Sequence, residues 1–263
     1  MFPGQRHLVA IVHSPSLLFF GRPPQAESAT IHGMNERQLN ENIAKLLERV
    51  RLSAEKSQRA ASDIRVLAVS KTQPAEAVRA AWHCGLLEFG ESYLQEALAK
   101  IEQLRDLAIT WHFIGPIQSN KTRDIAGHFD WVHSVDRVKI ARRLSEHRPQ
   151  HLAPLQICLQ VNISGEASKS GVSPQDLPHL AQEVLSLPRL QLRGLMAIPA
   201  RTAEVALQRT AFARLRQALE HLRQIAPDLD TLSMGMSSDL EAAIAEGSTI
   251  VRVGTGIFGS RNR

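Results

Sequence analysis

Cysteine is scarce in this sequence, which limits the kinds of site that it can build. The 263 residues contain two cysteines, Cys84 and Cys158, which lie far apart and match no zinc-binding or CxxC spacing. We therefore predict two reduced, packed thiols of a cytoplasmic protein. No Asp or Glu spacing around His112 or His133 completes a metal site, so we interpret both as structural histidines and expect no metal.

Long apolar runs are also missing. The apolar pieces near the N-terminus are short and interrupted by polar residues and a proline, which suits neither a transmembrane span nor a secretory signal. We interpret residues 1–33 as a disordered or loosely attached leader and residues 34–263 as one folded domain, with no membrane partner. Regular amphipathic sequence starts directly after Met34, and one hypothesis is that translation begins there. The intact mass of the protein from its native host tests this hypothesis.

Dense clusters of positive charge are absent as well. The formal net charge is +5, but the lysines and arginines are scattered through segments with a helical pattern. Solvated helix faces therefore explain the basic balance better than a nucleic-acid surface does. Nucleic-acid binding would rest on the overall basic balance alone, and we expect a monomer with no nucleic-acid partner.

What the sequence does contain is a regular alternation of strand and helix patterns. An amphipathic helix is predicted over residues 35–60, ahead of the first strand. Eight short apolar runs, separated by helical segments, are predicted strands: residues 66–71, 88–90, 110–114, 131–134, 155–161, 190–195, 231–234 and 250–253. This pattern predicts an α/β fold, a single (β/α)₈ TIM-type barrel with an extra N-terminal helix. A doubly wound sheet is the alternative, but it would normally need a glycine-rich turn after the first strand.

The first predicted strand ends in a lysine, Lys71. The carboxyl ends of the strands of a barrel share one rim, where ligands bind. A lysine on an apolar floor loses hydration, which lowers its pKa and frees its lone pair for attack on a carbonyl group. The alternative is that Lys71 is a solvated lysine that caps the strand, which a lone lysine would favour.

The last two predicted strands end in segments that suit an anion. Ser237 and Ser238 precede a predicted helix start, and Gly254-Thr255-Gly256 lets the backbone approach a ligand closely. Ordinary helix caps and turns explain these residues equally well. A lysine together with a phosphate cup nevertheless suggests a phosphate-bearing aldehyde, and pyridoxal 5′-phosphate fits that description. Arg252 could then donate a hydrogen bond to the pyridine nitrogen, which would disfavour a protonated ring.

Several segments together resemble the pyridoxal phosphate homeostasis (YggS/PROSC) family. The matching segments are residues 67–72 (LAVSKT), 89–93 (FGESY), 111–116 (WHFIGP), 118–121 (QSNK), 133–136 (HSVD), 161–163 (VNI), 168–171 (SKSG), 193–199 (RGLMAIP), 232–237 (LSMGMS) and 251–255 (VRVGT). They occur in the family's order and at comparable spacing over residues 35–261, which makes the resemblance specific.

The resemblance implies a fold-type III barrel similar to the N-terminal domain of alanine racemase. It implies that Lys71 holds pyridoxal phosphate as a Schiff base, that Ser237, Gly254 and Thr255 contact the phosphate, and that Arg252 faces the ring nitrogen. The function that it implies is pyridoxal phosphate homeostasis and delivery to apo-enzymes, without demonstrable catalytic turnover. The alternative is a pyridoxal phosphate-dependent amino-acid racemase.

Two further residues bear on this comparison. The family usually has asparagine where this chain has Ser92, whose shorter side chain would need a water molecule to replace an amide contact. Lys169 lies in the polar loop after the fifth predicted strand and is interpreted as a solvated lysine. A second hypothesis is that Lys169 accepts the aldehyde transiently during transfer to an apo-enzyme.

Overall fold

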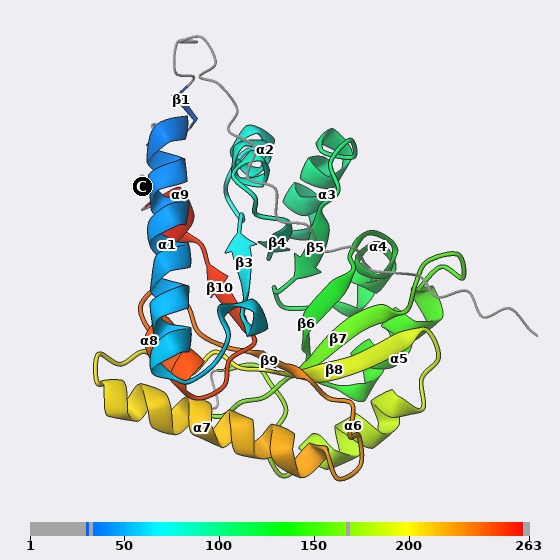
Figure 1. The fold of residues 1–263 in the computed structure, drawn as a ribbon. Coiled ribbons are helices and arrows are strands. Elements are labelled where there is room, and N and C mark those ends of the chain that lie inside the picture. Colours follow the sequence, from blue (N-terminus) through cyan, green and yellow to red (C-terminus); the bar gives the residue numbers. More distant parts are fainter. Residues whose placement is uncertain (1–29, 32–33, 167–168, 260–263) are drawn as a thin grey trace, which may run out of the picture.

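A closed barrel of eight parallel strands forms the centre of the protein (Figure 1). The computed structural model describes residues 30–31, 34–166 and 169–259. The barrel strands are β3 (Arg65–Val69), β4 (Glu88–Glu91), β5 (Thr110–Phe113), β6 (Trp131–Val135), β7 (Leu155–Gln160), β8 (Leu190–Met196), β9 (Thr231–Ser233) and β10 (Ile250–Val253). Strand β10 pairs with β3 and so closes the barrel. The predicted (β/α)₈ barrel is confirmed.

Helices connect the strands and cover the outside of the barrel. In chain order they are α2 (Ala75–His83), α3 (Leu94–Gln103), α4 (Thr122–His128), α5 (Val138–His147), α6 (Leu177–Leu185), α7 (Val205–Leu222) and α8 (Leu240–Ala245). The short helix α9 (Thr255–Phe258) follows β10, and single 3₁₀ turns, η1 (Ala61–Asp63) and η2 (Ser119–Lys121), precede β3 and α4. Parallel strands require crossover connections of this kind.

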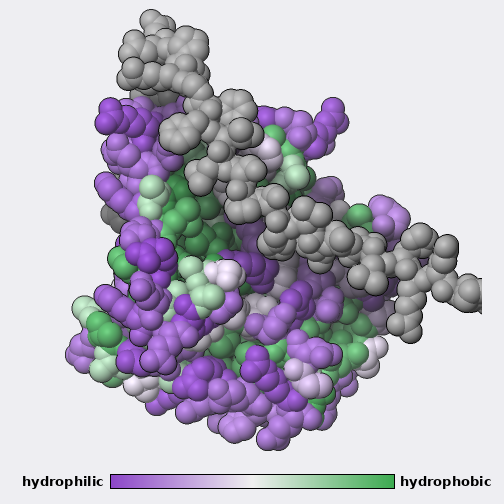
Figure 2. Space-filling view, viewed as in Figure 1, coloured by the Kyte–Doolittle hydropathy of each residue, from purple (hydrophilic) through white to green (hydrophobic). Residues whose placement is uncertain are grey.

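The predicted N-terminal helix is α1 (Glu36–Lys56). It begins where the Asn35 side chain accepts a hydrogen bond from the Gln38 backbone N–H at 2.8 Å, which caps the first turn. Apolar residues at helical spacing, such as Leu39 and Ile43, are buried on its inner side, and its outer side is hydrophilic (Figure 2). The helix packs on α8 and α9, so it supports the segments that follow the last two barrel strands.

The chain ahead of α1 is described only in part. Two short antiparallel strands, β1 (Thr30–Ile31) and β2 (Met34–Asn35), pair with each other. Residues 1–29 and 32–33 lie outside the described part of the chain, so the leader stays a prediction for them. Across the described residues, no helix is long and apolar enough to cross a membrane.

The alternation of side chains along the strands separates two apolar clusters. Leu67, Trp131, Cys158, Met196 and Ile250 come from five different barrel strands and contact one another, which is possible only inside the barrel. Ala68 and Phe89 belong instead to the large cluster between strands and helices. Within β3, Leu67 therefore faces the barrel interior and Ala68 faces the surrounding helices.

Candidate functional site

Lys71 lies at the carboxyl end of β3, at the mouth of the barrel. Strand β3 ends at Val69, two residues earlier than predicted, because the chain turns sharply between Ser70 and Gln73. The Gln73 N–H donates to the Ser70 carbonyl oxygen at 2.9 Å and closes this turn. Lys71 is half-buried at the corner of the turn. The predicted position at a rim between strand and helix is therefore confirmed, although the turn replaces the last residues of the strand.

Closure of the barrel brings the first and last strands together at the same rim. Ala68 on β3 pairs with Val253 on β10. A Cβ atom added to Gly254, the next residue, would lie 3.2 Å from the Val69 carbonyl oxygen. Glycine therefore permits close contact between the two chain segments. Lys71, two residues beyond Val69, follows directly on this contact.

Two of the residues predicted to hold a phosphate converge with the backbone of Gly256 beside β10. The Ser237 hydroxyl oxygen lies 3.3 Å from the Thr255 hydroxyl oxygen and 3.3 Å from the Gly256 backbone nitrogen. A Cβ atom on Gly256 would lie 2.9 Å from Val253 Cγ1 and 3.3 Å from Ser237 Oγ. It would therefore occupy the space beside Ser237, Thr255 and Gly256, which we call the cup. Two hydroxyl groups and a backbone N–H close together suit a phosphate group.

Gly256 was not among the predicted site residues, although the Gly-Thr-Gly motif that signals it is visible in the sequence. The sequence predicted free N–H groups at the start of the helix after Ser237 and Ser238, but one backbone N–H of this segment already donates within the protein. The Asp239 carboxylate accepts the Met236 N–H at 2.6 Å, and α8 begins only at Leu240. Burial raises the pKa of this carboxyl group.

The segment that carries Ser237 is held from outside the barrel by α1. Arg49 donates to the Ser237 carbonyl oxygen at 3.1 Å and forms an ion pair with Glu241 at 2.8 Å. These contacts link the added N-terminal helix to the cup and explain why that helix packs on α8.

Arg252 is buried inside the barrel below the mouth. Its Nη1 donates to the Ser233 carbonyl oxygen at 2.5 Å and to the Ser233 hydroxyl oxygen at 2.8 Å, and its Nη2 donates to the Ala197 carbonyl oxygen at 2.9 Å. Burial lowers the pKa of the guanidinium to about 10, opposed by the charge of Asp239. The group therefore stays protonated at neutral pH, and its position is determined by β8 and β9.

A chain of hydrogen bonds continues from Arg252 across the barrel interior. The Ser233 hydroxyl oxygen lies 2.8 Å from His133 Nδ1, and His133 Nε2 lies 2.9 Å from His112 Nδ1. At the far end, His112 Nε2 lies 3.4 Å from a carboxylate oxygen of Glu88. A carboxylate facing His112 Nε2 favours a proton on that nitrogen, so Nδ1 of each ring is an acceptor.

Both histidines are fully buried, and burial lowers the pKa of each. They are therefore neutral at pH 7, and the hydrogen bonds run from Arg252 to His112, whose Nε2 faces Glu88 without a hydrogen bond in the described residues. The interpretation of His112 and His133 as hydrogen-bonded structural residues agrees with these contacts. Among the described residues there is no group of three potential metal ligands.

Lys169 lies closer to the barrel mouth than a fully solvated loop lysine would. It is half-buried, and its Nζ is 3.5 Å from both the Ile198 carbonyl oxygen and Glu166 Oε1. It lines a hollow of about 250 Å³ with Ile114, Pro116, Gln160, Ser170 and Ile198. Ser92 is also half-buried at the rim, and its backbone contacts Gly115 so closely that a Cβ atom there would lie 2.2 Å from the Ser92 carbonyl oxygen.

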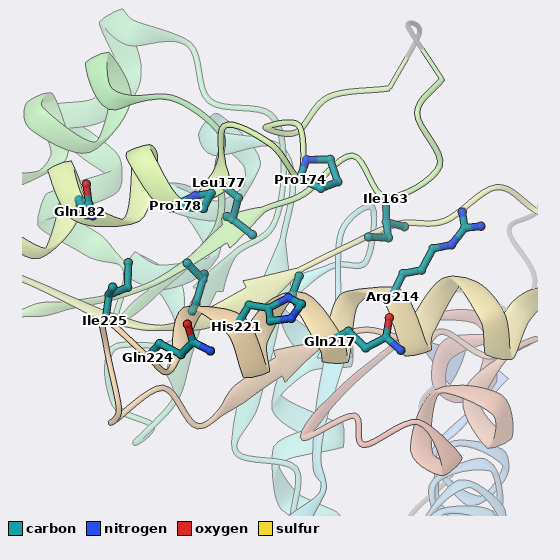
Figure 3. Close-up of a pocket in the computed structure, with 12 residues that line it drawn as sticks. Ile163, Pro174, Leu177, Pro178, Gln182, Arg214, Gln217, His221, Gln224 and Ile225 are labelled. Carbon is teal, nitrogen blue, oxygen red and sulfur yellow. The ribbon is translucent and has the colours of Figure 1, made fainter.

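A separate apolar groove of about 570 Å³ lies outside the barrel, between α6 and α7 (Figure 3). Leu177 and Pro178 contribute from α6, and Gln217 and His221 contribute from α7. None of the predicted cofactor-binding residues lines this groove. The site defined by Lys71, the cup and Arg252 is therefore distinct from it.

Comparison with known proteins gives the class of protein first. Residues 42–262 match the family model described as the alanine racemase N-terminal domain. The structure is similar to that of alanine racemase from Corynebacterium glutamicum, with a TM-score of 0.62 at 17% identity over 84% of this chain and 62% of that chain. At this identity the likeness concerns the fold, which is the barrel of that racemase domain.

Closer relatives define the family. The chain is 64% identical over 222 residues to the pyridoxal phosphate homeostasis protein of Pseudomonas aeruginosa, covering 84% of this chain and 95% of that protein. The corresponding protein of Escherichia coli K12 is 49% identical over 224 residues, covering 84% and 96%. The chain belongs to the family of pyridoxal phosphate homeostasis proteins.

A solved structure from the same group of proteins is also similar. PipY of Synechococcus elongatus, determined with pyridoxal phosphate bound, has a TM-score of 0.73 at 40% identity. The match covers 84% of this chain and all of that chain. The family predicted from the sequence motifs is confirmed.

Proposed function

We propose that this protein binds pyridoxal 5′-phosphate at the barrel mouth and takes part in its intracellular homeostasis and delivery to apo-enzymes. The observation that carries the proposal is the pairing of β3 with β10, because Lys71 follows the first strand and Thr255, beside Ser237, follows the second. The ligand-bound PipY structure and the family membership support it. When bound, the ligand supplies an aldehyde that condenses with a primary amine and releases one water molecule.

The residues present fit this ligand. Lys71 supplies the amine, and the Ser237 and Thr255 hydroxyl groups supply donors for the phosphate. Gly254 and Gly256 leave room for it, since a Cβ atom at either position would crowd its neighbours. Arg252 faces the ring nitrogen, and it can only donate there because a guanidinium stays protonated. These residues belong to one chain, so we propose that a monomer suffices, acting in the cytoplasm with both cysteines reduced.

The test is an absorption spectrum with the vitamer, followed by borohydride reduction and peptide mapping. We expect a coloured complex and a label on Lys71. Lys71→Ala should remain colourless, whereas Lys139→Ala, which removes an exposed lysine on α5, should behave like the wild type. A colourless wild-type protein, or a label on another side chain, would refute the proposal.

Catalytic turnover is tested separately. A racemase needs a second base, and Tyr93, the single tyrosine of the chain, is 53% exposed at the rim. We expect no enzyme-like exchange of amino-acid α-protons in deuterated water. Exchange at enzyme-like rates that Lys71→Ala abolishes would establish the racemase instead.

Transfer to an apo-enzyme is the finer part of the proposal, and Lys169 is the residue to change. If this lysine accepts the aldehyde during transfer, Lys169→Ala should slow activation of an apo-enzyme while the absorption of bound ligand is unchanged. Activation at the wild-type rate would show that Lys169 only lines the mouth.

A further inference from the structure

The turn that carries Lys71 has a conformation that its own residues disfavour. Thr72, the third residue of the turn from Ser70 to Gln73, has a φ of 67°. This left-handed region is favourable for glycine and strained for a β-branched residue such as threonine. Such strain persists only where the surrounding structure holds the backbone in place.

A buried ammonium group on α3 holds the backbone on both sides of Lys71. Lys100 is 4% exposed, and its Nζ donates to the Ser70 carbonyl oxygen at 2.7 Å. The same Nζ lies 2.6 Å from Glu96 Oε1, which accepts the Thr72 N–H at 2.6 Å. One contact therefore holds the peptide group before Lys71, and the other holds the peptide group after it.

Glu91, at the end of β4, completes the cluster. Its Oε1 accepts from Lys100 Nζ at 2.7 Å and from the Ser70 hydroxyl group at 2.6 Å, and the residue is 0% exposed. The three acceptors, Ser70 O, Glu91 Oε1 and Glu96 Oε1, match the three protons of the ammonium group. A buried charge that is paired in this way resists displacement, since moving it would leave charges unpaired in a dry environment.

We propose that Lys100, Glu91 and Glu96 are positioning residues that hold the Lys71 turn in its strained form. The inference rests on the proposed function, because it concerns how readily Lys71 reacts with the aldehyde. In the held turn the backbone on both sides of Lys71 keeps one conformation before any ligand arrives. Once the turn is released, Thr72 returns to an ordinary conformation and Lys71 must be reoriented during binding.

The first test replaces Glu96, because its side chain is 31% exposed and its loss leaves the barrel core intact. Glu96→Ala removes the acceptor of the Thr72 N–H. We expect about tenfold slower appearance of the absorption of bound pyridoxal phosphate in stopped-flow mixing, which corresponds to the left-handed penalty of an L-residue. Glu102→Ala is the matched control, since Glu102 lies on the same helix and pairs with the exposed Arg105.

A second variant separates positioning from general stability. Adding Thr72→Gly to Glu96→Ala removes the side chain that disfavours a positive φ, so the turn can form without its acceptor. We expect the double variant to recover most of the lost rate, although glycine makes the chain more flexible. A merely structural role of Glu96 predicts instead a lower midpoint of urea unfolding with an unchanged rate for the folded protein.

The possible results are distinguishable. A wild-type rate for Glu96→Ala, with Lys71 still carrying the borohydride label, overturns the positioning role and leaves the proposed function intact. A slow rate that Thr72→Gly fails to restore also overturns it. A wild-type protein labelled at another residue overturns both the inference and the function on which it rests.

Discussion

The two neutral histidines inside the barrel make the stability of the protein sensitive to acid. His133 is fully buried between the Ser233 hydroxyl group and His112, and burial holds its pKa well below the ordinary value. The unfolded chain exposes the same imidazole to water, where its pKa is about 6.5. As the pH falls below that value, the unfolded state binds a proton that the folded state does not, so acid favours unfolding.

The size of the effect follows from this difference in proton binding. If His133 remains neutral in the folded state, lowering the pH from 7 to 5 removes about 2 kcal/mol of stability through this one residue. His133→Gln replaces the imidazole with an amide, which can accept and donate hydrogen bonds at similar positions but does not titrate. At pH 7 we expect this variant to be about 1–3 kcal/mol less stable than the wild type, because the hydrogen bonds are imperfectly replaced.

Urea unfolding at the two pH values measures the prediction. The stability difference between the wild type and His133→Gln should shrink by about 2 kcal/mol at pH 5, because only the wild type titrates at this position. His179→Gln, at an exposed position on α6, should leave the pH dependence of the wild type unchanged. A difference between the wild type and His133→Gln that stays constant from pH 7 to pH 5 would refute the assignment of a buried neutral imidazole.

Two other changes test the cup and the interior. Gly256→Ala places a methyl group 2.9 Å from Val253 Cγ1 and 3.3 Å from Ser237 Oγ. We expect about tenfold weaker binding of pyridoxal phosphate in an absorbance titration, equivalent to about 1.4 kcal/mol, and unchanged affinity would show that the cup does not hold the ligand. Burial raises the pKa of Cys158 to about 12. Iodoacetamide should therefore modify Cys158 only after unfolding, whereas labelling of the native protein at the rate of Cys84 would contradict this burial.

Much of the fold and part of the site follow from local patterns. The strand boundaries and the ends of the N-terminal helix were predicted to within a few residues, because each apolar run is short and bounded by turn residues. Lys71 was placed at the rim because it follows such a run, and the Gly254-Thr255 segment because it follows another. The end of β3 was predicted two residues too late, since the positive φ of Thr72 has no signal in an ordinary Ser-Lys-Thr sequence.

The amino-acid sequence by itself determined the alternation of strands and helices, and with it a barrel whose rim collects Lys71 and the glycine-rich end of β10. Only the tertiary structure decided which groups, distant in the sequence, form hydrogen bonds and ion pairs with one another. Lys100 has the position of an ordinary helix lysine, yet the packing of α3 beside the ends of β3 and β4 buries it against Ser70 and Glu91. Such contacts depend on the distance between separate elements in space, which periodicity along one element does not encode.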